Sequence, residues 1–246
     1  MTICEAALST TTAALPVPGR EGKDRALVQA MFDRVAPRYD LANTLLSMGQ
    51  DAHWRRVAAL AAQPVGARVL DVAAGPGNVA QELVARGAKD VVAADLSYNM
   101  LAEGHRRGLP DIHFVNADAL ALPFADNSFD AVTISFGLRN LVDPAAGLAE
   151  FHRVARSGAR MVVMEFAAPT WAPLRKVYSE YLMQALPRIA EVVSSDGSSY
   201  GYLAESIAAW PDRRVVADWM ASSGWQHVKV KDLSGGIVAI HRGFKA

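Results

Sequence analysis

The feature that most constrains the fold of this chain is a glycine turn that joins a short strand to a helix. Residues 67–78 read ARVLDVAAGPGN, in which a buried-strand pattern at 69–72 leads into Gly75 and Gly77. Glycine adopts backbone angles that other residues resist, and it lets a ligand come close to the main chain. The helix that follows offers free N–H groups to a negatively charged ligand atom. The segment therefore predicts a ligand-binding turn at the end of the first strand of an α/β fold.

An acidic residue follows at the end of the next strand. This second predicted strand, residues 90–94, leads directly into Asp95. In α/β folds, an acid at this place holds a ribose by its two hydroxyls when a glycine turn ends the first strand. We therefore expect Asp95 to bind a ribose. The alternative is that Asp95 caps the helix that begins at Tyr98, a role that Ser97 could equally fill.

The turn alone leaves three interpretations open. The pattern Gly75-x-Gly77-x-x-Ala80 also satisfies the looser dinucleotide fingerprint, in which alanine replaces the third glycine. A nicotinamide or flavin oxidoreductase therefore fits as well as an S-adenosylmethionine methyltransferase. The third interpretation is a strand–helix turn without a ligand, and the acid in register with the turn speaks against it.

Composition excludes several classes of protein. The 246 residues include 25 basic and 25 acidic ones, so a broad basic face for nucleic acid is not expected. The single cysteine, Cys4, rules out an intrachain disulfide and fits a reducing compartment. The six histidines show no metal-ligand spacing, so we expect no metal. No apolar run approaches the roughly 18 residues of a transmembrane helix. We expect a cytoplasmic protein.

The chain divides into a tail and one domain. Residues 1–24 lack any hydrophobic period, and we expect them to be disordered. The domain, residues 25–246, is expected to hold a helical lid, a cofactor-binding core, a helical region on the acceptor side and a C-terminal β-hairpin. These four parts are predicted at residues 25–62, 63–168, 169–222 and 223–246.

The core alternates strands with helices. Such alternation builds a parallel sheet with right-handed crossovers, and ligands bind outside the carboxyl ends of its strands. A turn is predicted at residues 156–159, before the fifth strand, and a loop at residues 194–199. The strands are predicted at residues 68–73, 91–94, 112–115, 131–136 and 161–166. Asp71, Gly75, Asp95, Asp118 and Ser135 fall at or near strand ends.

The last segment decides between the fold types. Two strands, residues 226–233 and 236–244, are joined through Ser234 and Gly235. So short a connection implies an antiparallel hairpin. A dinucleotide domain continues with parallel strands, whereas a reversed last strand is typical of class I S-adenosylmethionine methyltransferases. On this knowledge of folds, we predict their Rossmann-like α/β fold, with a seven-stranded, mostly parallel sheet and an antiparallel last strand.

Several motifs resemble those of the menaquinone and ubiquinone C-methyltransferases. The most specific is the run TISFGLRN at residues 133–140, at the end of the fourth strand. The resemblance spans about residues 27–245. It is also carried by MFDxVAxxYDxxN at 31–43, LSxG at 46–49, Trp54-Arg55, Glu165-Phe166, YLxxSI at 202–207 and GGIVAxHxG at 235–243.

Two segments depart from the family pattern. The turn holds Gly75-Pro76-Gly77-Asn78 where the family has Gly-Thr-Gly-Asp or Gly-Thr-Ala, and residues 156–159 read RSGA where Pro-Gly-Gly is usual. Proline lacks the hydroxyl and the backbone N–H that could touch the methionine end of the cofactor. Neither change removes an indispensable group, but both leave room for a relative with another acceptor.

The resemblance implies methyl transfer from S-adenosylmethionine to a ring carbon of demethylmenaquinol, the last step of menaquinone biosynthesis. The partner would be a lipophilic prenylated naphthoquinol, reached by peripheral contact at the inner face of the cell membrane, and a homodimer is left open. The alternatives are a C- or O-methyltransferase of another aromatic or isoprenoid acceptor, an NAD(P)-dependent oxidoreductase and a non-catalytic cofactor-binding module. The strand-four motif and the terminal hairpin argue against the oxidoreductase.

Within this family, the residues at strand ends would bind the cofactor. Asp95 would hold the ribose, Asp118 and Ala119 the adenine, and Ser135 would lie near the sulfonium. Asp71 would order the turn or meet the methionine ammonium through water. For Asp118 the alternative is a turn aspartate, and for Ser135 a small polar core residue. The predicted cofactor-binding residues are Asp71, Gly75, Pro76, Gly77, Asp95, Asp118, Ala119 and Ser135.

The predicted catalytic residues are Arg139, Asn140 and Tyr39. Arg139 and Asn140 follow the fourth strand, where the methyl group should emerge. Arginine stays charged at physiological pH, so Arg139 is expected to hold an oxyanion or order a water. The alternative for Arg139 is a salt bridge to the helix after the fourth strand. Tyr39 could bond a quinol oxygen, and no residue stands out as the proton acceptor. Further lid contacts are expected from Asp40, Asn43 and His53.

Overall fold

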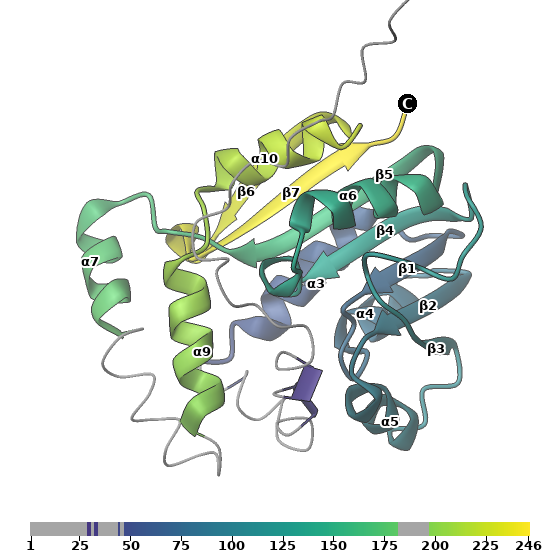
Figure 1. The fold of residues 1–246 in the computed structure, drawn as a ribbon, viewed down its shortest axis with the longest axis horizontal. Helices are drawn as coiled ribbons and strands as arrows, with labels where there is room; N and C mark the ends of the chain where they lie inside the picture. Colours follow the sequence, from purple (N-terminus) through teal and green to yellow (C-terminus); the bar gives the residue numbers. More distant parts are fainter. Residues whose placement is uncertain (1–28, 31, 34–43, 45–46, 182–196) are drawn as a thin grey trace, which may run out of the picture.

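A single seven-stranded sheet runs through the protein, with helices on both of its faces (Figure 1). The computed structural model describes residues 29–30, 32–33, 44, 47–181 and 197–246. Within these ranges no helix is both long enough and apolar enough to cross a membrane. The elements are α3 (Asp51–Ala62), β1 (Arg68–Val72), α4 (Asn78–Ala85), β2 (Asp90–Asp95), α5 (Tyr98–Arg106), β3 (Ile112–Asn116), β4 (Phe129–Ser135), η2 (Leu138–Asn140), α6 (Pro144–Val154), β5 (Ala155–Phe166), α7 (Ala172–Glu180), α9 (Gly197–Ala208), α10 (Arg213–Ser222), β6 (Gln226–Leu233), η4 (Ser234–Gly236) and β7 (Val238–Phe244).

The strand order across the sheet is β3-β2-β1-β4-β5-β7-β6. The first five strands pair in parallel, and β7 runs antiparallel between β5 and β6. The predicted sheet and its reversed last strand are therefore confirmed. From β1 the chain moves outward to β2 and β3, then returns to add β4 on the other side of β1. The carboxyl ends of β1 and β4 therefore flank the switch point, where α/β sheets bind ligands.

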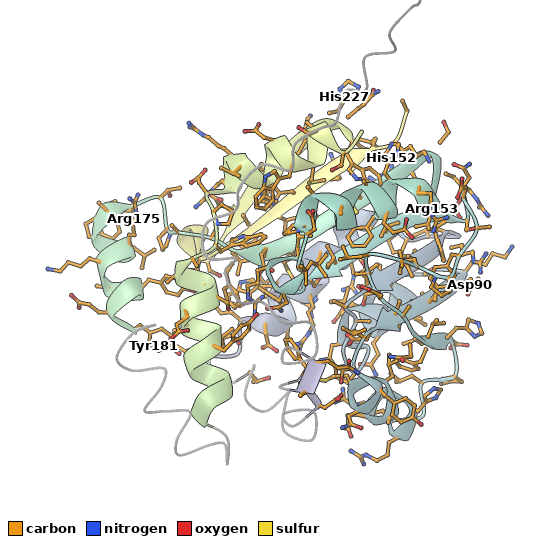
Figure 2. The ribbon with its side chains drawn as sticks, viewed as in Figure 1. Asp90, His152, Arg153, Arg175, Tyr181 and His227 are labelled. Atoms are coloured by element: carbon orange, nitrogen blue, oxygen red, sulfur yellow. The ribbon has the colours of Figure 1, made fainter. Side chains whose placement is uncertain are left out.

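Side chains of the central strands alternate between two apolar cores. On β1, Leu70 and Val72 belong to the core that also holds Leu148 of α6 and Trp219 of α10. Val69 belongs to the other core, with α3 and α4. Because both faces are covered, the strands read as almost continuous apolar runs rather than as alternating ones. Figure 2 shows side chains filling the space between the sheet and its helices.

Two local predictions were wrong. Residues 156–159, predicted as a turn, belong to β5, and the pairing of β5 with β4 is interrupted between Ala155 and Arg160. The N–H of Gly158 donates to the carbonyl oxygen of Lys245, so a residue far along the chain holds this extension in place. Residues 197–199, predicted as part of a loop, begin α9. Serine is frequent at helix starts as well as in loops, so composition did not separate the two.

The chain segments that follow β1 and β4 approach each other very closely. A Cβ built on Gly137 would lie 2.4 Å from the Cβ of Ala73. The φ of Gly137 is −106°, so lack of space, rather than backbone angle, requires glycine there. Ala73 has a φ of +51°, in the left-handed region that favours glycine. Small residues on both sides therefore let the two strand ends meet at the switch point.

We expect Gly137→Ala to lower the free energy of unfolding by about 1–3 kcal/mol, because the added methyl overpacks a rigid contact. Urea denaturation measures the change. The double variant Gly137→Ala/Ala73→Gly should recover most of the loss, since it removes the opposing Cβ and glycine accepts the φ of residue 73. A single variant as stable as the wild type would show that this contact is not tight.

Candidate active site

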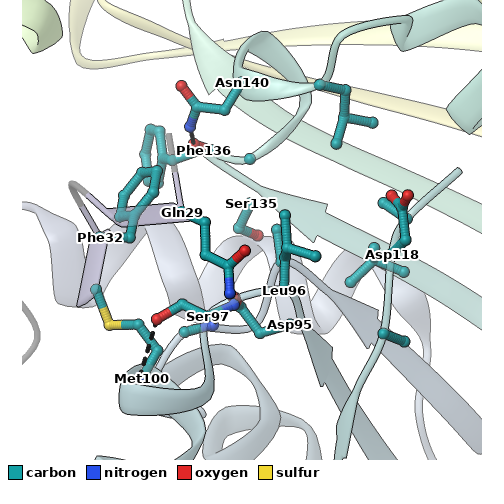
Figure 3. Close-up of a pocket in the computed structure, with 17 residues that line it drawn as sticks. Gln29, Phe32, Asp95, Leu96, Ser97, Met100, Asp118, Ser135, Phe136 and Asn140 are labelled. Atoms are coloured by element: carbon teal, nitrogen blue, oxygen red, sulfur yellow. Dashed lines mark hydrogen bonds between the residues drawn. The ribbon is translucent and has the colours of Figure 1, made fainter. Parts of the chain in front are cut away.

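A pocket opens at the carboxyl ends of the strands, above the point where β1 and β4 meet (Figure 3). Its wall is formed by residues that follow β1, β2, β3 and β4, together with Gln29 and Phe32 from the N-terminal segment. The pocket has about 710 Å³ of empty volume, part of it open to solvent. In α/β sheets, ligands bind outside the carboxyl ends of the strands at the switch point, so this is the place where a small-molecule ligand is expected.

The glycine turn lies at the base of this pocket. Gly75 and Gly77 have φ values of +57° and +88°, which a residue with a Cβ adopts only under strain. Gly75 lines the pocket, whereas Gly77 and Pro76 do not line it. Gly77 is the N-cap residue of α4 and packs on Phe114, whose Cζ would lie 3.0 Å from an added Cβ. The two glycines thus serve different ends, one facing the ligand space and the other allowing helix and strand to pack.

Asp95 is fastened to the same turn. Its Oδ2 accepts from the N–H of Gly75 at 2.7 Å, and its Oδ1 accepts from the N–H of Ser97 at 2.8 Å. Burial raises the pKa of this carboxyl, and hydrogen bonds from the backbone N–H groups of Ser97, Gly75 and Leu96 oppose the shift. The helix cap is Ser97, whose Oγ accepts from the N–H of Met100. A carboxylate has about four acceptor positions, so the Asp95 carboxylate can still accept from a hydroxyl in the pocket.

Asp118 lies at the opposite end of the pocket from Asn140, as Figure 3 shows, and the next residue, Ala119, also lines the pocket. Asp118 also builds a turn, because its Oδ1 accepts from the N–H of Leu120 at 3.0 Å and its carbonyl accepts from Ala121. Asp118 is therefore a turn aspartate, which was the alternative interpretation from the sequence, and it also lines the pocket. Its predicted contact with adenine stays a prediction.

Two buried polar atoms at the strand ends have no hydrogen-bond partner among the described residues. One is the Oγ of Ser135, which lines the pocket at the end of β4. The other is the Oδ2 of Asp71, which lies on β1 beneath the turn and does not line the pocket. Buried polar groups are nearly always paired, so an unpaired one beside a pocket is a place where a ligand or a water binds.

The Asp71 carboxyl stays protonated, and therefore neutral, up to a higher pH than the carboxyl of an ordinary aspartate. Burial raises its pKa from 3.8 to about 7, the hydrogen bond from Thr133 lowers it, and the nearby charge of Asp95 raises it further. The Thr133 Oγ1 donates to the Asp71 Oδ1 at 2.6 Å, across the paired strands β1 and β4. A positive charge entering the pocket would shift this equilibrium toward the carboxylate.

Arg139 lies outside the pocket wall, in a buried ion pair. Its Nη1 donates to the Oε1 of Glu165 at 2.9 Å, and the two side chains are only 5% and 1% exposed. The backbone N–H of Arg139 donates to the other carboxylate oxygen at 3.2 Å. The guanidinium also lies over the ring of Phe166, 5.2 Å from its centroid. The salt bridge that the sequence offered as an alternative is thus present, but with β5 rather than with α6.

Asn140 is the predicted catalytic residue that faces the pocket. Its Nδ2 donates to the carbonyl oxygen of Phe136 at 3.3 Å, and its Oδ1 accepts from the hydroxyl of Tyr202 at 3.2 Å. Burial raises the pKa of Tyr202, so this hydroxyl stays a donor. These bonds leave the Asn140 amide with a second N–H for a ligand oxygen.

Other expectations have different outcomes. Tyr39, Asp40 and Asn43 lie outside the described residues, so their roles stay predictions. His53 is exposed on α3 and is not part of the pocket wall. Several residues that line the pocket were not among the predicted site residues, including Gln29, Phe32, Ser97 and Phe136. For Phe136 the available signal was its place directly after the fourth strand.

Comparison with known proteins identifies close relatives. The model of the ubiE/COQ5 methyltransferase family matches residues 20–245. A protein from Renibacterium salmoninarum, named demethylmenaquinone methyltransferase, is 58% identical over 89% of this chain and 92% of its own length. A protein of the same name from Mycobacterium marinum is 54% identical over 91% of this chain and 95% of its own.

Solved structures share the fold at low identity. A methyltransferase from Thermotoga maritima, described as a possible histamine N-methyltransferase, has a TM-score of 0.65 at 18% identity, over 89% of this chain and all of its own. The [4+2]-cyclase SpnF has a TM-score of 0.59 at 19% identity, over 95% of this chain and 99% of its own. Such likenesses show the fold alone, and it is the class I fold that the sequence predicts.

We expect Asp71 to make stability depend on pH. Its pKa is 3.8 when unfolded and about 7 when folded, so between these values the folded state binds more protons. The contribution of Asp71 to the free energy of unfolding therefore falls as pH rises from about 4 to about 7, by a few kcal/mol at most. Asp71→Asn removes this titration, so its melting temperature relative to wild type should rise between pH 5 and pH 8. The exposed Asp111→Asn is the control. A difference that stays constant with pH would contradict the assignment.

We expect Arg139→Met to lower the free energy of unfolding by about 3–5 kcal/mol, because it leaves the Glu165 carboxylate buried without a counter-charge. Urea denaturation measures the loss. Adding Glu165→Gln should recover part of it, since a neutral amide needs no counter-charge. Arg106→Met breaks an exposed pair with Glu103 and should cost about 1 kcal/mol or less. Equal costs for the two arginines would mean that burial does not matter here.

Proposed function

The chain belongs to the ubiE/COQ5 methyltransferase family, and from this premise we propose that it methylates a ring carbon of demethylmenaquinol. It is an S-adenosylmethionine-dependent methyltransferase, as the family and the relatives at 52–58% identity establish. The observation that carries the proposal is the pocket, because it joins the Asp95–Gly75 turn to the family's strand-four motif in one cavity. The cofactor and the acceptor can therefore meet there.

The residues present fit the cofactor. S-adenosylmethionine, when bound, supplies a methyl group on a positively charged sulfur. Asp95 has an acceptor position left for a ribose hydroxyl, and Gly75 exposes its backbone to the pocket. The unpaired hydroxyl of Ser135 offers a dipole to the sulfur end. We propose that Asp118 and Ala119 hold the adenine, while Pro76, Gly77 and Asp71 act from behind the wall by shaping the turn.

The acceptor end would work mainly by orientation. A quinol ring carbon beside a hydroxyl is electron-rich; it gains the methyl group and then loses its proton to restore the aromatic ring. Holding that carbon in line with the methyl group supplies much of the rate. We propose that the free N–H of Asn140 donates to the quinol oxygen as negative charge develops there. Arg139 is then a positioning residue that acts through Phe136 and Asn140, and Tyr39 stays a candidate donor from the lid.

The lipid character of the acceptor bears on location. A prenylated naphthoquinol dissolves in the bilayer, so we propose that the enzyme meets it at the inner face of the cell membrane. Support comes from α7, next to which Trp171 is 66% exposed and on which Val177 is 62% exposed. Figure 2 shows Arg175 on the same helix and Tyr181 just after it. An exposed tryptophan beside a helix that carries an exposed apolar and a basic side chain is typical of contact with a lipid surface.

A turnover assay with methyl-labelled S-adenosylmethionine tests the function. We expect label to enter chemically reduced demethylmenaquinone presented in detergent, and not the oxidised quinone, because only the reduced ring carbon is nucleophilic. Asp95→Ala should abolish turnover and weaken cofactor binding measured by calorimetry, whereas the exposed Asp111→Ala should do neither. If the wild type binds the cofactor but labels neither form, the acceptor is a different one.

A further inference from the structure

Phe136 combines two properties that rarely occur together. It lines the pocket directly after β4, and its backbone has a φ of +57°. For a residue with a bulky side chain this left-handed conformation is costly, and glycine or asparagine is the usual occupant. Residues held in such conformations concentrate at functional sites. The aromatic ring is therefore kept at this position against a conformational cost.

The protein fixes this backbone from both sides of the peptide. The N–H of Phe136 donates to the carbonyl oxygen of Met164 at 2.8 Å. Its own carbonyl oxygen accepts from the guanidinium of Arg139 and from the Asn140 amide at 3.3 Å. Because Arg139 is paired with buried Glu165, the guanidinium has a fixed position. The ion pair thus holds the residue whose ring faces the ligand space.

The ring itself is backed by two further aromatic rings. The ring of Phe166 lies 4.7 Å from that of Phe136 at a tilt of 40°, and the ring of Trp54 lies 6.0 Å away at a tilt of 55°. Trp54 is 4% exposed, and its Nε1 donates to the Oγ of Ser234 at 2.8 Å. With its back packed on fixed aromatic groups, the ring of Phe136 has little freedom to turn away from the pocket.

We infer that the Phe136 ring is the stacking surface for the flat, bicyclic aromatic ring of the acceptor. In Figure 3, Phe136 and Asn140 lie at the end of the pocket opposite Asp118, which is the end left for the acceptor. An aromatic ring packs on another in an offset or tilted arrangement and gains more than its buried area alone provides. The Asn140 N–H beside it can reach an oxygen on the ring edge. This assignment rests on the proposed function, and it makes Phe136 a specificity-determining residue.

The kinetics of Phe136→Leu and Phe136→Met test this role, since both keep an apolar side chain and remove the ring. Loss of stacking should raise the KM for a short-prenyl demethylmenaquinol by about two- to tenfold. The kcat should change little, because stacking acts equally on the bound ground state and the transition state. Phe136→Tyr keeps the ring and should keep the KM. Phe124→Leu removes a partly buried ring outside the pocket and should also leave the KM unchanged.

Calorimetric affinity for S-adenosylmethionine shows whether each variant is folded, and it should match the wild type. A folded Leu or Met variant with wild-type KM would overturn the stacking role. An equal rise of the KM in Phe136→Tyr would also overturn it, since the ring is still there. Failure of the proposed function looks different, because the wild type itself would then transfer no methyl group to demethylmenaquinol.

Discussion

The buried ion pair between Arg139 and Glu165 is the interaction on which one half of the pocket depends. Two charges this deep cost desolvation energy that only good geometry can offset. Here the geometry includes a second bond from the Arg139 backbone to the same carboxylate, and a guanidinium bond to the carbonyl oxygen of Phe136. The pair therefore joins β5 to the turn after β4. It also stabilises the left-handed backbone conformation of Phe136, which is unfavourable for a phenylalanine.

The two ends of the pocket are built on different physical principles. At the β1–β2 end, Asp95 and Gly75 bind each other through a hydrogen bond, and the charge faces the ligand. At the β4 end, the charges of Arg139 and Glu165 are paired behind the wall, and what faces the ligand is an amide and an aromatic ring. A polar nucleoside suits the first environment, and a flat lipophilic ring suits the second.

The sequence was informative where a local pattern determines geometry. The glycine turn and the short link between β6 and β7 each predicted a feature that the structure has. Asp95 lies at the end of β2 beside that turn, and its contact with a ribose stays a prediction. The sequence was not informative where partners come from distant segments. The partner of Arg139, Glu165, is 26 residues away on β5. No rule of sequence spacing indicates that the partner lies on this strand and not on the helix after the fourth strand. Likewise the left-handed backbone conformation of Phe136 depends on packing around β4. The TISFGLRN motif therefore indicated where the site lies but not that Phe136 has a positive φ.

The position of β7 has a consequence for the order of folding. This strand follows every other described element in the chain, yet it lies between β5 and β6 within the sheet. The turn before it supplies Ser234, which binds Trp54 behind Phe136. During synthesis the N-terminal part of a chain is available first. Leu233, Val238 and Ile240 of the last hairpin also belong to the apolar core that holds Val69 of β1. The sheet beneath the pocket and the aromatic groups behind Phe136 are therefore complete only when the last residues of the chain have been made.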